Sequence, residues 1–493
     1  MELTAYKVLG QLSRMDKVRG IEGLQSDLIG RDEEFSKPRD TLQALLSRRG
    51  HIAMITGEAG VGKSRLVAEL KRSVAKYRKE GREPLWLEGR CLDLGITGSY
   101  GPFIDMFREY FDLCPESNDD ARAKQLETCL HELSQDGSLE ENRHREIAPV
   151  LGDLMSIVLG EGGGDGLQNV DAGQRQSRTF LAIRDLLLAL TRRHPVILVL
   201  EDLHWADSIS LDLISLLMES LATAPLLLLC TCRPDGSHKA RHLSGVASRK
   251  CPERYTEIIL RELTTKESAL LIESLLDVEE LPKPTKALIA EKAQGNPFFV
   301  EEVIRSLIDG GIIYDEGKSW KASRIVKQIE LTESVQSVIL SRIDRLRDDQ
   351  KRLLQNASVI GRVFRKNILK RIVDRGEHLD SNLQELQDLA LIYQERVAPE
   401  VEYSFRHVLT QETIYQTILE SHRREHHRAH ALRFFADHAR KNHVPFRFHS
   451  FFQETLERHN HASETAEHVD RLPSVYQFVV NDFSPWIIAP MPQ

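Results

Sequence analysis

The stretch that decides the fold is GEAGVGKS, residues 57–64. It has the spacing G-x-x-x-x-G-K-[ST], in which glycines let backbone N–H groups turn towards phosphate oxygens. The apolar run HIAMIT (51–56) precedes it, and the segment after it carries apolar residues at helical spacing, at Leu66, Leu70, Val74 and Tyr77. Strand, glycine-rich loop and helix in this order indicate a phosphate-binding loop.

The residue types in this loop predict its ligands. Lys63 places a positive charge at the β and γ phosphates, and the Ser64 hydroxyl is an expected ligand of Mg²⁺. The dipole of the following helix also favours an anion at this point. We therefore expect ATP or ADP with Mg²⁺ as cofactors, contacted by Gly57, Glu58, Ala59, Gly60, Val61, Gly62, Lys63, Ser64 and Arg65.

A second nucleotide-binding element is expected at the end of the apolar run PVILVL (195–200), where Glu201 and Asp202 follow. An acidic residue in this position can hold Mg²⁺ and orient the attacking water. Adjacent strand residues point to opposite faces, so one of the two faces the phosphates more directly. We assign Asp202 to the metal and Glu201 to polarisation of water, with exchanged roles or a solvated strand end as the alternatives.

The run PLLLLCTCR (225–233) predicts another buried strand, and Arg233 closes it. In a parallel sheet the strand ends line the ligand crevice, so a cation there lies near the γ-phosphate. Arg233 is thus the predicted γ-phosphate sensor, and a surface ion pair is the alternative. Together with Glu201 and Asp202 it completes the predicted catalytic set.

Short apolar strands with helical patterns between them predict an α/β fold, a mostly parallel sheet covered by helices on both faces. Helical patterns follow from Thr264, and two short alternating runs flank Ala398 and Pro399 as in a hairpin. The expected order is a connector at 1–27, a P-loop nucleotide-binding domain at 28–263 with a helical insertion at about 102–192, an all-α lid at 264–330, a winged-helix-like domain at 331–420, and a helix with an unassigned tail at 421–493.

Composition limits the class of protein. A chain of 493 residues with 41% hydrophobic and 28% charged residues is expected to form several folded domains. The amino terminus has no secretory pattern, no apolar run approaches the roughly 20 residues of a membrane span, and the six cysteines lack metal-ligand or disulfide spacing. These features predict a cytoplasmic protein with reduced thiols and no membrane partner.

Several phrases in order extend this interpretation: LIGRDEEF (28–35), GEAGVGKSR (57–65), GRCLDLGITGSYGPF (89–103), VILVLEDLHWADSISLDLI (196–214), CTCRPD (230–235), GNPFFVEEV (295–303) and YSFRHVLTQETIY (403–415). With them the chain resembles the STAND branch of the AAA+ ATPases (AAA_16, Orc1-like). The resemblance is to the ATPase region of bacterial signalling proteins that couple a class III adenylate or guanylate cyclase to tetratricopeptide repeats, and it covers roughly residues 5–437.

The resemblance implies further site residues. Gly30 and Arg31 are expected beside the adenine, Pro297 near the base from the lid, and Arg233 at the γ-phosphate. His407 resembles a winged-helix histidine that touches the β-phosphate of ADP and locks the resting state. An ordinary packed or surface histidine is the alternative for His407, since neutral imidazole fits either role.

The resemblance also implies a function: a slow signal-transduction ATPase that alternates between a closed ADP form and an open ATP form. Its output would pass to a protein partner or to a fused domain, and oligomerisation stays open. We find no cyclase domain before residue 28 and no helical repeats after about residue 437. We therefore expect no cyclase activity, and a truncated or frameshifted reading frame is one hypothesis for the chain.

A DNA-binding regulator is the alternative function, because winged helices often enter the major groove. Against it, the candidate recognition segment SNLQELQDL (381–389) carries Glu385 and Asp388 but no lysine or arginine to meet phosphates. The formal net charge of −8 gives no overall attraction for nucleic acid either. DNA is thus a disfavoured partner. His422, His426 and His430 share one expected helix face, which we interpret as solvated rather than metal-binding.

Overall fold

The computed structural model describes residues 28–77, 83–91, 99–113, 118–157, 171–234, 237–276, 283–315, 320–322, 335–373, 378–396 and 401–418. The predicted connector (1–27) and the carboxyl-terminal segment (421–493), which includes His422, His426 and His430, lie outside these residues. The described residues divide into two compact units: the first comprises those up to Arg342 together with Arg396, and the second comprises Ile343–Glu395 and residues 401–418. Over the described ranges, no helix combines the length and apolar character needed to cross a membrane.

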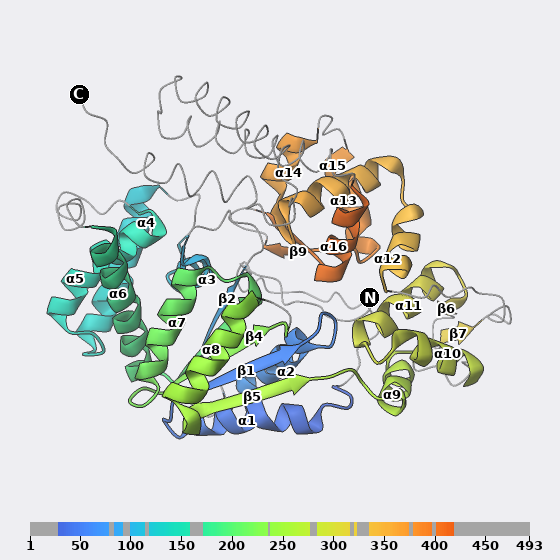
Figure 1. Ribbon diagram of the computed structural model, residues 1–493. Helices are drawn as coiled ribbons and strands as arrows, with labels where there is room; N and C mark the ends of the chain where they lie inside the picture. The colour runs from blue at the N-terminus through green and yellow to red at the C-terminus, as the bar shows by residue number, and fades with distance from the viewer. Residues whose placement is uncertain are drawn as a thin grey trace, which may run out of the picture. The chain divides into compact units, whose positions relative to one another are not determined.

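The first unit is built on a five-stranded sheet in the order β2-β3-β4-β1-β5 (Figure 1). Its strands are β1 (His51–Gly57), β2 (Leu85–Arg90), β3 (Val196–Glu201), β4 (Leu226–Cys232) and β5 (Tyr255–Leu260). Every neighbouring pair is parallel. The predicted parallel α/β fold is therefore confirmed. The loops that follow the five strands all leave from the same side of the sheet, where the strands have their carboxyl ends.

Alternating side chains of the central strands enter two separate cores, one on each face of the sheet. Leu198 and Leu200 of β3 pack in a cluster with α7 (Ser208–Ser220), α8 (Ser237–Lys250) and the helical insertion. Ile197 and Val199 pack instead with α1 (Asp32–Leu46) and α2 (Lys63–Ala75). All residues of β3 and β4 are buried, which explains why both read as continuous apolar runs.

The insertion after β2 is helical where it is described. It consists of α3 (Gly101–Tyr110), α4 (Asp119–Gln135), α5 (Glu141–Met155) and α6 (Ala172–Arg193). Side-chain caps begin two of these helices: the Asn118 side chain accepts from the Ala121 N–H at 2.8 Å, and Asp171 accepts from the first turn of α6. Short 3₁₀ turns at Leu203–Trp205 and Pro252–Arg254 flank α7 and α8.

Three helices follow β5 in the first unit, namely α9 (Thr265–Leu276), α10 (Lys283–Ala293) and α11 (Pro297–Asp309). They share one apolar core, in which Ile272, Ile289 and Val300 are completely buried. We refer to this segment as the lid. To the predicted helices the structure adds a short antiparallel pair, β6 (Ile313–Asp315) and β7 (Trp320–Ala322), which follows Gly311 in its left-handed conformation (φ +67°). The helix α12 (Val335–Asp344) comes next.

The second unit combines short helices with a three-stranded sheet. Its elements are α13 (Asp348–Ile360), β8 (Val363–Arg365), α14 (Lys366–Ile372), α15 (Leu379–Asp388), β9 (Ile392–Arg396), β10 (Glu402–Phe405) and α16 (Val408–Thr417). The sheet order is β8-β10-β9, and β8 and β10 are antiparallel. Phe364 packs against Tyr403 and Phe405, so the sheet contributes to its own small core. The assignment as a winged helix stays a prediction.

Candidate nucleotide-binding site

The loop between β1 and α2 depends on glycine at two positions. Gly60 and Gly62 have φ of +87° and +104°, the left-handed region that side chains with a Cβ adopt at a cost. A Cβ at Gly60 would lie 2.5 Å from Oδ1 of Asn296, whereas one at Gly62 would meet nothing within 4 Å. The loop thus uses two of its glycines in a left-handed conformation, and Gly62 is the residue before α2.

Lys63 is the first residue of α2, and its side chain reaches back to the backbone of the loop. Its Nζ donates to the carbonyl oxygens of Gly57 at 2.7 Å and Glu58 at 2.9 Å. Burial lowers the pKa of Lys63 to about 8, the negative charge of Asp202 opposes this shift, and the positive charge of Arg233 adds to it. Lys63 begins the helix after β1, whereas Asp202 follows β3 and Arg233 follows β4, so the three predicted site residues lie beyond the carboxyl ends of three neighbouring parallel strands.

The two acidic residues at the end of β3 lie in different environments. Glu201 is the last residue of the strand and only 1% exposed, and Arg90 is opposite it in the parallel register. The Arg90 guanidinium donates to Oε2 of Glu201 from Nη2 at 2.9 Å and from Nε at 3.2 Å. Asp202 has already left the strand, with φ +59°, and its N–H donates to Oγ1 of Thr231 at 3.0 Å. Asp202 is therefore the carboxylate whose charge reaches Lys63.

Arg31 contacts the loop through hydrogen bonds from its guanidinium group. This residue precedes α1, is 5% exposed, and donates from Nη2 to the carbonyl oxygens of Val61, at 3.2 Å, and of Arg261. Its Nη1 also pairs with Glu34 at 2.9 Å. The preceding Gly30 has φ +65°. Arg31 thus ties the phosphate-binding loop to the residue after β5, and an adenine contact for Gly30 and Arg31 stays a prediction.

The lid reaches the loop through a residue that the sequence did not single out. Asn296 donates from Nδ2 to the carbonyl oxygen of Ala59 at 3.0 Å, and its Oδ1 caps α11 by accepting from the N–H of Phe298 at 3.1 Å. The Phe298 N–H also lies 3.4 Å from the carbonyl oxygen of Gly60. Pro297, the predicted base contact, is the first residue of α11. The Asn-Pro pair is a helix-start signal that could have identified Asn296.

Oxygen donors suited to Mg²⁺ are present at this edge of the sheet. Ser64 and Arg65 are partly exposed residues in the first turn of α2, and Arg65 lies 4.0 Å from Glu69. A hydroxyl at Ser64 and a carboxylate at Asp202 are the hard ligands that Mg²⁺ accepts together with phosphate oxygens and water. The donor chemistry therefore fits the predicted ion, and Mg²⁺ there would neutralise phosphate charge.

His407 belongs to the second unit. It precedes α16 and caps it, since its Nδ1 accepts from the N–H of Leu409 at 3.1 Å. The neutral ring then carries its proton on Nε2. The predicted contact between His407 and the β-phosphate of ADP stays a prediction.

Comparison with known proteins supports the nucleotide site. Residues 27–229 match the family described as AAA ATPase domain, and residues 264–319 match a domain of unknown function (DUF8739). With the sheet order and the loop geometry, the first match shows an AAA+ P-loop fold, and it supports nucleotide binding at this loop. The chain is also similar to an uncharacterized protein of Rhizobium meliloti (strain 1021), R02095, with 25% identity over 428 residues. The matched residues make up 86% of this chain but only 38% of that relative.

Solved structures with similarity to the chain include a Signal Transduction ATPase with Numerous Domains (STAND) protein with a tetratricopeptide repeat sensor from Pyrococcus horikoshii. It has 15% identity and a TM-score of 0.43, and the match covers 96% of this chain and 53% of that chain. The ORC2 protein of Aeropyrum pernix has 13% identity and a TM-score of 0.37, over 79% of this chain and 95% of that chain.

Proposed function

We propose that the chain is a regulatory ATPase whose phosphate-binding loop binds ATP or ADP with Mg²⁺ and whose lid changes its contact with the loop according to the nucleotide. The carrying observation is that Lys63 begins the helix after β1, while Asp202 and Arg233 directly follow the neighbouring parallel strands β3 and β4, and that both of their charges act on the Lys63 ammonium. One ammonium, one carboxylate and one guanidinium beside a glycine loop are the groups that phosphoryl transfer requires.

In this proposal each group has a separate task. The loop amides and Lys63 bind the β and γ phosphates, the helix dipole of α2 adds to the attraction, and Arg233 stabilises the charge that develops on the γ-phosphate. Ser64 and Asp202 would hold Mg²⁺. Glu201 would polarise the attacking water, but its carboxylate is bonded to Arg90 at 2.9 Å. A carboxylate in such a pair is a weakened proton acceptor, which supports slow turnover.

The lid supplies the switch. Asn296 and Phe298 hydrogen-bond to the carbonyl oxygens of Ala59 and Gly60, which belong to the loop that would wrap the phosphates. Because a ligand shifts an equilibrium only through different contacts in its two states, the γ-phosphate has to alter these contacts for the lid to respond. We propose that it does, with Gly30, Arg31 and Pro297 placed around the base.

The output is proposed to go to a protein partner or to a fused domain, since the chain spans only 38% of its Rhizobium relative. The second unit would be a winged helix in which His407 reads the β-phosphate of ADP. DNA binding is not favoured, because α15 carries no lysine or arginine, and its acidic residues pair with basic ones: Glu385 with Arg347 at 2.8 Å, and Asp380 with Lys366. A link to cyclase and tetratricopeptide modules belongs to the same proposal.

The test is to measure ATP and ADP binding, and phosphate release, with Mg²⁺ for the native chain, Lys63→Ala and Asp202→Asn. Lys63→Ala should weaken binding of both nucleotides, and Asp202→Asn should leave binding largely intact while abolishing turnover. The matched control is Lys71→Ala, which removes an exposed lysine of the same helix and should change neither quantity. A folded native chain that binds neither nucleotide would exclude the proposed ATPase.

A further inference from the structure

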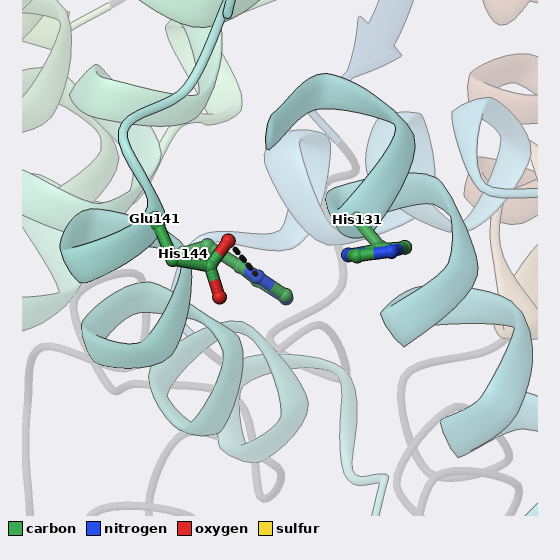
Figure 2. Close-up of side chains that lie close together, drawn as sticks. All are labelled: His131, Glu141 and His144. Carbon is green, nitrogen blue, oxygen red and sulfur yellow. Dashed lines mark ion pairs between the residues drawn. The ribbon is translucent and has the colours of Figure 1, made fainter. Parts of the chain in front are cut away.

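A cluster of possible metal ligands lies in the helical insertion, away from the phosphate-binding loop in the chain. His131 is on α4, and Glu141 and His144 are on α5. One ligand atom of each residue, a ring nitrogen or a carboxylate oxygen, lies within 4.8 Å of the other two. Figure 2 shows the two α5 side chains side by side and the His131 ring facing them from the neighbouring helix.

The polypeptide holds these three residues together through the tight turn between the helices. Asp136 accepts from the N–H of Ser138 at 2.9 Å, and the N–H of Leu139 donates to the carbonyl oxygen of Leu133 at 2.7 Å. Leu130, Leu133 and Leu139 are buried in the core below the turn. Glu141 and His144, three residues apart, lie on one face of α5. The ligands therefore stand on a rigid support rather than on a mobile loop.

One ligand atom of the cluster, a ring nitrogen of His144, has no hydrogen-bond partner among the described residues. Nδ1 of His144 is inaccessible to solvent and has no hydrogen-bond partner among the described residues, and it lies 4.0 Å from Oε2 of Glu141. Glu141 is 53% exposed and accepts from Ser134 at 2.8 Å and from Arg145 at 3.3 Å. The remaining contact joins Nε2 of His131 to Nε2 of Gln135 at 3.0 Å. A buried ring nitrogen without a hydrogen-bond partner needs an explanation, and a cation held between this nitrogen and the carboxylate would provide one.

We propose that His131, Glu141 and His144 bind a divalent transition-metal ion, with Zn²⁺ as the best match. Two imidazoles and one carboxylate suit zinc, whereas Mg²⁺ and Ca²⁺ require oxygen ligands. In a tetrahedral site with Zn–N distances of about 2.0–2.1 Å, ligand atoms lie roughly 3.4 Å apart, so exposed side chains must rotate only slightly to close it. The Arg145 side chain is 74% exposed and can leave Glu141 for solvent.

With three protein ligands the ion keeps one position open to water. It would join the carboxyl-terminal part of α4 to the first turn of α5 and so hold the insertion together independently of the nucleotide. The site is thus separate from the Mg²⁺ site at Ser64 and Asp202 both in its ligand chemistry and in the part of the chain that supplies it.

The test uses the full-length chain without an affinity tag. His422, His426 and His430 are replaced by alanine in all samples, which removes the alternative set of histidines expected on one helix face. Zn²⁺ is titrated by calorimetry in the presence of millimolar Mg²⁺, and Co²⁺ is added separately to record the absorption bands of a tetrahedral site. We expect one tight equivalent of Zn²⁺, together with a higher melting temperature when Zn²⁺ is bound.

His131→Ala, His144→Ala and Glu141→Gln should each weaken Zn²⁺ binding by more than the roughly 10–100-fold typical of losing an outer-shell partner, because each removes a direct ligand. His194→Ala and Glu146→Gln are the matched controls and should bind like the parent. Glu141→Gln keeps the shape of an exposed residue, so it serves as the test even where a histidine variant unfolds. Unchanged Zn²⁺ affinity in Glu141→Gln, or no tight equivalent in the parent, would overturn the proposal.

Discussion

Arg90 and Glu201 stand opposite each other in the parallel register of β2 and β3, and their side chains form a 2.9 Å ion pair. The pair lies at the edge of the sheet where the nucleotide is expected to bind. Glu201 is almost completely buried, so its charge depends on this contact for compensation. The pair therefore links the stability of the sheet edge to the availability of a carboxylate for catalysis.

Removing Arg90 should be costly. Arg90→Ala leaves the buried carboxylate of Glu201 without its main counter-charge, which typically costs about 3–5 kcal/mol of unfolding free energy. The double variant Arg90→Ala/Glu201→Gln removes both charges and should recover a large part of this loss. Urea-induced unfolding of the two variants and of the native chain measures the difference. Equal stability of the single and double variants would show that the pair does not matter.

Alanine substitution should lower the unfolding free energy by different amounts at the two loop glycines, Gly60 and Gly62. Gly62→Ala meets no neighbour, so it should cost only the left-handed strain of about 1–2 kcal/mol. Gly60→Ala carries the same strain and also displaces Asn296, with the cap of α11 and the contact to Ala59. We expect the larger loss of unfolding free energy for Gly60→Ala, measured without nucleotide. A larger loss for Gly62→Ala would contradict the arrangement of lid and loop.

A buried charge network ties α11 to α12. Glu302 pairs with Arg305 at 3.1 Å and with Arg342 at 2.6 Å, and all three are at most 5% exposed. Glu302→Gln should lower the unfolding free energy by about 3–5 kcal/mol, because it leaves two buried guanidinium groups with less negative charge. Thermal and urea unfolding measure this effect. Glu219→Gln, which breaks an exposed pair with Lys250, is the control and should change little. Similar losses in both variants would contradict this account.

Much of the fold could be predicted because the central strands are short, continuous apolar runs. The run PVILVL contributes most of a strand that is buried on both faces, and Lys63, Asp202 and Arg233 lie at the same end of the sheet because they follow neighbouring parallel strands. The alternation rule did not distinguish Glu201 from Asp202, because the strand ends at Glu201 and Asp202 turns away with a left-handed backbone. The local sequence contains no signal that predicts this turn.

The contacts that sequence reasoning missed are those between distant segments. Arg90 and Glu201 are 111 residues apart in the sequence, and their pairing depends on the register of β2 and β3. The contact between Asn296 and Ala59 depends on how the lid packs against the loop. His131 and Glu141 likewise come together across the segment that joins α4 to α5. Spacing along the chain carries no regular signal for such contacts.

The central claim is that the lid senses the nucleotide through the loop, and the N–H of Phe298 reports on it directly. This amide hydrogen lies between Oδ1 of Asn296 on the lid and the carbonyl oxygen of Gly60 on the loop. Its hydrogen exchange should be measured at saturation with ADP and with a non-hydrolysable ATP analogue, both with Mg²⁺, using amides of α10 as the internal reference. The account predicts clearly different exchange rates at Phe298 in the two states and equal rates in α10. Identical rates at Phe298 with both nucleotides bound would contradict the proposed switch.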